Sequence, residues 1–116
     1  MKLLDLSKMI SLVASPVDLR RGWRSLSVMA AAFLNIDVTE GEDIVVFISK
    51  NGKLCKVIGA DEKGTYVLTR KLYEGCFQRL MTRIENSQAE PLSVKELERY
   101  LDGEKIQEKR SRLECF

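Results

Sequence analysis

The chain has 116 residues, of which 45% are hydrophobic and 31% are charged, and its formal net charge is +2. This length suits one domain, and the composition provides for both a core and a solvated surface, which excludes a disordered chain. Histidine is absent, so nucleophilic catalysis assisted by histidine and metal sites built on histidine pairs are excluded.

The first predicted elements are a strand and a helix. Met9–Ala14 is an apolar run that the Ser15-Pro16 breaker ends, which is typical of a short strand. Between Leu19 and Leu34, apolar residues recur at helical spacing, so this segment predicts a helix with one face on a core. Two starts fit this helix. Either Asp18 caps it, or Ser15 caps it and Asp18 closes a capping box that has proline at the first helical position.

A meander of three strands is predicted next. Ile44–Ile48 is a continuous β-branched and aromatic run, typical of a central strand. Asn51-Gly52 indicates a type I′ hairpin turn, because such a turn needs positive φ at both central residues, and Lys53–Ala60 is the returning strand. After a turn at Glu62–Gly64, Thr65–Leu72 has the residue types of a third strand.

The remainder of the chain contains one ambiguous segment and one clear helix. The apolar residues of Cys76–Glu85 fit a helix, but the flanking turn residues also frame a strand, and we favour a strand or an irregular edge. Ser93 and Glu96 have the spacing of a capping box, apolar residues follow at helical spacing, and Gly103 ends the helix. Lys105–Phe116 is a charged tail.

These elements predict an α+β fold in which the antiparallel meander packs against one amphipathic helix, with a second short helix near the C-terminus. Residues 1–104 are expected to form a single domain and residues 105–116 its tail. No apolar run reaches the roughly 18 to 20 residues of a membrane span and no secretory signal is evident, so we expect a cytoplasmic protein. The cysteines lack disulfide or zinc spacing, and we expect two core thiols and one tail thiol: Cys55, Cys76 and Cys115.

Charge is distributed unevenly along the chain. The segment Lys50–Arg83 has eight basic and three acidic residues, a net charge of +5. From Ile84 to Glu104, two basic and six acidic residues reverse the sign to −4, and Asp37–Asp43 is a second acidic patch. This pattern predicts that one face of the molecule is basic and another acidic.

Three arginines are expected in the first turns of the first helix, where the helix dipole disfavours cations by about 0.3 to 1 kcal/mol each. They are Arg20, Arg21 and Arg24. Guanidinium groups beside the free N–H groups of a helix start are a plausible phosphate-binding site. The alternative is a solvated face on which Asp18 or Glu40 compensates the charge.

Five further basic residues on the predicted hairpin and third strand extend this arginine patch across the sheet as a candidate nucleic-acid surface. They are Lys50, Lys53, Lys56, Arg70 and Lys71. The competing interpretation is that lysines on turns and edge strands protect against edge-to-edge pairing. Tyr66 and Tyr73 are expected to pack in the sheet rather than to stack on bases.

No catalytic, metal or cofactor site is predicted. Four acids lie near candidate strand ends, but no flanking motif supports a metal: Asp18, Asp43, Asp61 and Glu85. The glycines are isolated turn residues, so they do not indicate a loop that cradles a nucleotide phosphate.

Several motifs, in order from about Met9 to Ile106, resemble the TnpB (second open reading frame) accessory proteins of the insertion sequence 66 group of bacterial transposons. Ser15–Gly22 (Ser-Pro-Val-Asp-Leu-Arg-Arg-Gly) is similar to the family's Gly-Pro-Thr-Asp-Met-Arg-Lys-Gly. Lys71–Phe77 looks like its Lys-Arg-Leu-Glu-x-Gly-Arg-Phe. The other matching segments are Val46-Phe47, Lys56–Ile58, Gly64, Leu92–Leu97 and Leu101–Gly103. This chain departs from the family at Gly59-Ala60, where aromatic residues are usual.

The resemblance implies a non-catalytic role in transposition, alongside a separate transposase of the same element. Together with the basic segments, it leads us to expect an accessory protein that binds DNA at the transposon ends. An alternative stays open: an adaptor that binds the transposase, or its own copy as a homo-oligomer, without contacting DNA. The acidic closing helix or a sheet edge would serve that adaptor as its contact surface.

Overall fold

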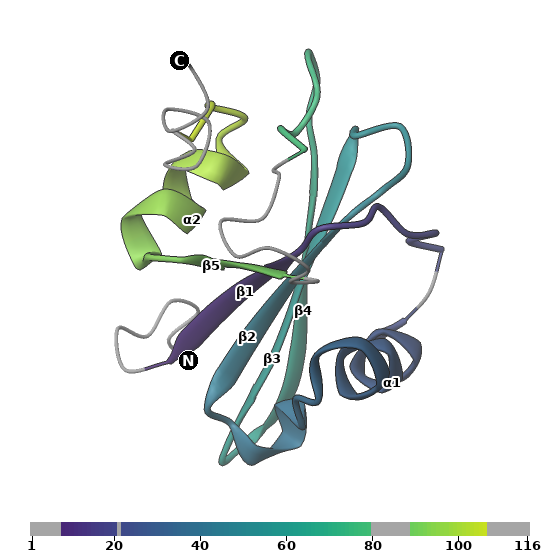
Figure 1. Cartoon of the computed structure of the whole chain (residues 1–116), viewed down its shortest axis with the longest axis vertical. Coiled ribbons are helices and arrows are strands. Elements are labelled where there is room, and N and C mark those ends of the chain that lie inside the picture. The colour runs from purple at the N-terminus through teal and green to yellow at the C-terminus, as the bar shows by residue number, and fades with distance from the viewer. Residues whose placement is uncertain (1–7, 21, 80–88, 107–116) are drawn as a thin grey trace, which may run out of the picture.

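The computed structural model describes residues 8–20, 22–79 and 89–106 of the chain. Two helices flank a five-stranded sheet whose strands lie in the order β4-β3-β2-β1-β5 (Figure 1). The strands are β1 (Met9–Val13), β2 (Asp43–Ile48), β3 (Leu54–Asp61), β4 (Gly64–Lys71) and β5 (Ala89–Leu92). The helices are α1 (Trp23–Leu34) and α2 (Val94–Leu101), and a short 3-10 helix covers Val38–Glu40. The predicted α+β fold is confirmed.

The meander β2-β3-β4 is antiparallel, as predicted, but β1 pairs with β2 in the parallel sense. Because α1 and the 3-10 helix connect these two strands, the chain returns to the same end of the sheet before β2 begins. The central strand β2 is buried on both sides, from Ile44 to Ile48. This burial explains why its sequence is a continuous apolar run rather than an alternating one.

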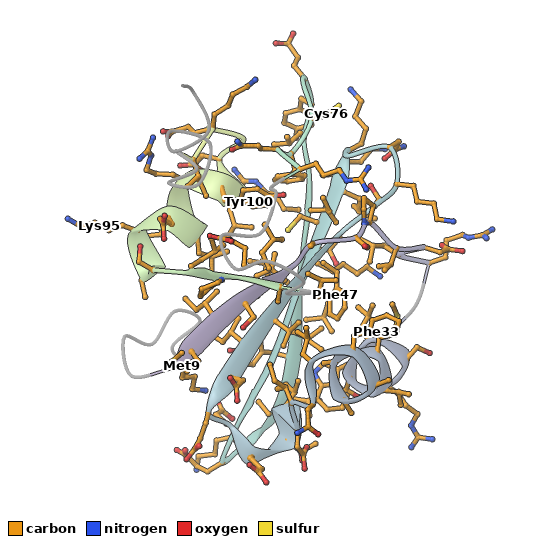
Figure 2. All side chains as sticks on the ribbon, in the orientation of Figure 1. Met9, Phe33, Phe47, Cys76, Lys95 and Tyr100 are labelled. Atoms are coloured by element: carbon orange, nitrogen blue, oxygen red, sulfur yellow. The ribbon has the colours of Figure 1, made fainter. Side chains whose placement is uncertain are left out.

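Two apolar clusters fill the two faces of the sheet. On one face, Val45 and Phe47 of β2 pack with Leu26 and Ala30 of α1. On the other, Ile44 and its alternate neighbours along β2 pack with residues of α2. Figure 2 shows Phe47 on the α1 side of the sheet and Tyr100 of α2 on the other. Each helix therefore stabilises one face, because successive side chains of a strand point to opposite faces.

Neither predicted start of the first helix is correct. The N-cap of α1 is Gly22, which makes no side-chain cap hydrogen bond, and the helix begins at Trp23. The preceding residues extend the β1 region instead, since Val17 N–H donates to the Ile48 carbonyl at 2.9 Å and Leu19 is buried with the α1-side cluster. Burial of an extended segment thus prevails over the capping potential of Ser15 and Asp18.

The β2-β3 hairpin forms as predicted, but its turn is not type I′. Gly52 has a φ of +74°, whereas Asn51 does not adopt positive φ. The loop is wider than two residues, because β2 ends at Ile48 and β3 begins at Leu54. The hydrogen bond from Gly52 N–H to the Ser49 carbonyl, at 3.0 Å, closes the turn within it. At the next hairpin, Asp61 Oδ1 accepts hydrogen bonds from the amides of Lys63 and Gly64.

The C-terminal part confirms the closing helix and adds a strand that was not predicted. The Ser93–Glu96 capping box is complete in both directions at α2, and Gly103 follows its end with a φ of +82°. β5 pairs antiparallel with β1 at the sheet edge. Residues 76–79 form no strand or helix, and residues 80–85 of the ambiguous segment lie outside the described residues. The chain stays packed as far as the buried Ile106.

One cysteine prediction is confirmed and one is wrong. Cys55 is buried in the α2-side cluster, and burial raises the pKa of its thiol to about 12. Cys76 is exposed rather than in the core, and Cys115 lies outside the described residues. Within the described part of the chain, neither helix has the length and apolar character needed to cross a membrane.

Candidate functional site

A cavity of about 550 Å³ opens where three segments from distant parts of the sequence meet. Residues 17–20, which follow β1, form one side, and the tip of the β2-β3 hairpin forms another. Lys71, the last residue of β4, contributes the third. In Figure 1 the purple segment after β1 runs beside this hairpin tip, in agreement with the parallel bridge between Val17 and Ser49. We call this cavity the basic pocket.

Backbone pairing and one buried side chain hold the first wall of the basic pocket. The Val17 amide hydrogen bonds to β2, and the neighbouring Leu19 side chain is 4% exposed within the α1-side cluster. Because these two residues are anchored, the side chains of Asp18 and Arg20 are directed to the pocket and the surface. Asp18 Oδ1 also accepts the Arg20 backbone N–H at 3.0 Å, which fixes the local turn of the chain.

Polar side chains shape the hairpin wall. Ser49 Oγ donates to Asn51 Oδ1 at 2.8 Å, and Asn51 Oδ1 also accepts the Lys53 N–H at 3.0 Å. Ser49 Oγ in turn accepts the Leu54 N–H at 3.1 Å. These bonds satisfy backbone N–H groups that would otherwise bind water in so wide a loop. The lysines of this loop therefore extend from an ordered backbone.

Residues 72–77, which follow β4, form hydrogen bonds with the same loop. Leu72 N–H donates to the Lys53 carbonyl at 3.1 Å, and Phe77 N–H donates to the Gly52 carbonyl at 2.7 Å. Both bonds join residues that are distant in sequence, and the Phe77 side chain is buried in the α2-side cluster. The hairpin tip and the end of β4 are therefore held together on a packed core.

Among the charged residues that line the basic pocket, cations outnumber acids. Its cations are Arg20, Lys50, Lys53 and Lys71, and the acid among its lining residues is Asp18. Arg20 and Asp18 form an ion pair with 2.8 Å between the nearest atoms, while 90% of the Arg20 side chain is exposed. The hydrogen bond to Asp18, and then its charge, raise the pKa of Arg20. The lining therefore retains a formal charge of +3, open to water on one side.

Four of the eight sequence-predicted residues line the basic pocket, and three others lie elsewhere. Arg24 is exposed in the first turn of α1. Among the described arginines, it is therefore the one that lies at the N-terminal end of a helix dipole, as predicted. Lys56 lies in the interior of β3, beyond the pocket lining. Arg70 pairs with Asp102 beyond the end of α2, at 3.6 Å, on the opposite face of the sheet. Arg21 lies outside the described residues.

Sequence reasoning missed the polar framework of the pocket and misplaced one tyrosine. Ser49 and Asn51 were not singled out, although a serine two residues before Asn-Gly is the pattern of a side-chain-closed turn. Tyr66 is buried, as expected for sheet packing, but the Tyr73 side chain is wholly exposed, with a relative accessibility of 104%. Tyr73 follows Lys71 by two residues but is not among the residues that line the basic pocket.

The chemistry available in the basic pocket is that of anion binding. Ammonium and guanidinium groups donate hydrogen bonds to anionic oxygens, and phosphate or carboxylate ligands suit them best. Ser49, the hydroxyl among the lining residues, is engaged within the loop rather than paired with a base. In the described part of the chain, no group of three cysteine or acidic side chains has the geometry to hold a metal ion.

Comparison with known proteins gives one informative match. No curated protein and no solved structure matches the chain significantly. The model of the IS66 Orf2-like protein family matches residues 8–111, which include β1, the whole basic pocket and α2. The match covers most of the 116 residues. The chain therefore belongs to the IS66 Orf2-like proteins, a family associated with transposition.

Proposed function

We propose that this protein acts in transposition by binding the phosphate backbone of DNA through the basic pocket, without catalysing a reaction itself. The observation that carries the proposal is the convergence of Arg20 with Lys50, Lys53 and Lys71, from three separate segments. The proposed DNA target is the ends of the transposon, which this protein would bind alongside a separate transposase. We propose that the protein acts in the cytoplasm of a bacterial cell.

Electrostatics favours a polyanion over a small metabolite as the ligand of this pocket. The cations lie on an open surface, where a single ion pair contributes little because water and salt screen it. A duplex presents many phosphates at once and releases condensed counterions when it binds, so several exposed cations together give substantial affinity. The braced loop reduces the entropy lost on binding, since its backbone is already ordered.

The test is binding of the full chain to duplexes of transposon-end sequence, measured by fluorescence anisotropy over a salt series. Binding should weaken steeply as salt rises. A Lys50→Ala/Lys53→Ala variant should lower the slope of log K against log salt by about 0.9 for each phosphate that is no longer neutralised, up to about 2 for the pair. At low salt we expect the affinity to fall by tenfold or more.

Lys95→Ala is the matched control, because Lys95 projects from α2 on the other side of the sheet (Figure 2). It removes a positive charge but leaves the pocket unchanged, so its salt slope should equal that of the wild type. Circular dichroism should show that every variant is folded. Absence of binding at low salt, or equal losses for the pocket and control variants, would overturn the proposal.

The adaptor alternative finds less support on the acidic closing helix. Glu96 is engaged in the capping box, Asp102 pairs with Arg70, and the neighbouring Glu104 pairs with Arg99 at 3.2 Å. These three carboxylates would have to leave their contacts to bind a partner, which leaves the exposed Glu98 as the acid of α2 open to one. Co-purification with the transposase, unchanged by the pocket substitutions, would favour the adaptor over the DNA-binding protein.

A further inference from the structure

The outer face of α1 has an unusual composition for the surface of a protein. Leu26 and Ala30 bury one side of this helix against the sheet, and Figure 1 shows the helix on the outside of the molecule. A surface helix ordinarily has charged and polar side chains on the face away from the core, and a helix that is apolar on every side is ordinarily buried. In α1, Arg24 is the single charged residue among 12. The outer face of α1 therefore has the composition of a covered surface.

Exposed residues form a continuous row along this outer face. They are separated alternately by four and three positions, so they lie on one side of the helix, as do the residues by which two helices pack in a coiled coil. The residues are Arg24, Val28, Ala31 and Asn35, and we call them the α1 seam. Val28 near its centre is 62% exposed. The seam is thus apolar in its middle and polar at both ends.

The charges at the two ends of α1 are the reverse of those that stabilise an isolated helix. The helix dipole favours acids in the first turn and bases in the last turn, but α1 has no acid in its first turn and no base in its last. Its first turn contains Arg24 instead, and two exposed acids follow its end, Asp37 and Glu40. Asp37 caps the 3-10 helix through the Thr39 N–H and keeps its negative charge. Within the described part of the chain, Arg24 forms no ion pair that would compensate its position.

A second copy of α1, packed antiparallel to the first, compensates both ends at once. The first turn of each helix then lies beside the last turn of the other. Arg24 of each copy meets the carboxyl end of the other helix, where the dipole favours a cation and Asp37 follows. A parallel copy would bring like ends together instead. We propose that the α1 seam is a homodimer interface, in which two α1 helices pack antiparallel about a two-fold axis.

One register pairs all residues of the α1 seam. With the two-fold axis midway along the helix, Val28 lies opposite Ala31 of the second copy. Arg24 then lies opposite Asn35, the C-cap residue of the other helix. Because each valine meets an alanine methyl group, the two helix axes can approach to about 8 Å, the short end of the usual range. A seam along one short helix gives a small interface of roughly 1,200 Å², so we expect a dissociation constant on the order of micromolar. The proposal does not depend on DNA binding.

The direct test measures the dimer by sedimentation velocity over a concentration series of the full chain. Ala31→Lys introduces a good helix former at an exposed position of the last turn, where the dipole favours a base, so the monomer should stay folded. In the dimer the added charge would face Val28 and lie one turn from Arg24 of the other copy, so the dissociation constant should rise tenfold or more. Glu98→Gln is the matched control. It changes the net charge equally at an exposed position of α2, and its dissociation constant should lie within about threefold of the wild type.

The charge argument has its own test, in which two readouts move in opposite directions. Arg24→Glu places an acid in the first turn of α1, so the thermal midpoint of the dilute monomer should rise. The same substitution places each glutamate at the carboxyl end of the other helix, so the dissociation constant should rise about threefold to tenfold. Arg24→Lys keeps the charge and should leave the dissociation constant within about threefold of the wild type. High salt should reduce the difference between the wild type and the glutamate variant.

Spectra of the wild type keep the proposal testable if a variant fails to fold. In proton–nitrogen correlation spectra over a concentration series, the amide signals that shift should belong to α1 and to residues 35–37, which the second copy contacts. A chain that is monomeric up to several hundred micromolar would overturn the proposal, and so would a dimer whose shifted signals lie away from α1. If the wild type is monomeric and Ala31→Lys abolishes co-purification with the transposase, then the transposase covers the α1 seam, and a second copy does not.

Discussion

Gly59 allows the Tyr66 side chain to approach β3 closely. A Cβ atom at this position would overlap the phenol of Tyr66, its partner across the β3-β4 ladder. The Gly59 carbonyl accepts a hydrogen bond from Trp23 Nε1 at 3.1 Å, which attaches the first residue of α1 to the sheet. This chain departs from the family resemblance at Gly59, and Tyr66 of the next strand occupies the space above it.

Gly59→Ala should therefore destabilise the protein by about 1–3 kcal/mol, because the added methyl group forces the Tyr66 ring out of place. Urea unfolding followed by circular dichroism measures this change. The control is the same substitution in a Tyr66→Ala background, where the space is open and the cost of the methyl group should largely disappear. Equal costs in both backgrounds would contradict the steric explanation.

At the scale of elements, the sequence predicts helices and strands that are determined by local periodicity. It does not predict those that depend on partners distant in sequence. The capping box of α2 and the apolar run of β2 appear where the sequence placed them. The predicted start of α1 was wrong, because pairing and burial beside β2 stabilise Val17 and Leu19 more than an extra helical turn would. β5 was missed because four residues including a proline carry little strand signal without β1 beside them.

The corrected start of α1 predicts the effects of two substitutions at its N-terminal side. Gly22 has φ of −87° in the extended region, makes no side-chain cap bond and has open space where a Cβ atom would lie. Gly22→Ser should therefore stabilise the protein by about 0.5–1 kcal/mol, through a new cap and a less flexible unfolded chain. Thermal unfolding should show a higher midpoint.

Ser15→Ala is the companion substitution that separates the two helix starts. Because Ser15 precedes the extended segment and does not cap α1, its loss should change the stability by less than about 0.5 kcal/mol. If Ser15→Ala instead lowers the free energy of unfolding by about 1 kcal/mol or more, and Gly22→Ser has no effect, then Ser15 rather than Gly22 caps the helix.

At the scale of the whole molecule, the sequence contained the basic residues of the pocket but not their grouping. Arg20 lies 30 residues before Lys50, and the parallel β1-β2 pairing brings their segments together. Arg70 and Lys71 are adjacent in sequence, yet strand alternation directs Arg70 to the α2 side and Lys71 to the pocket. The basic stretch in the sequence therefore contained cations of the pocket, while sheet register decided which of them meet.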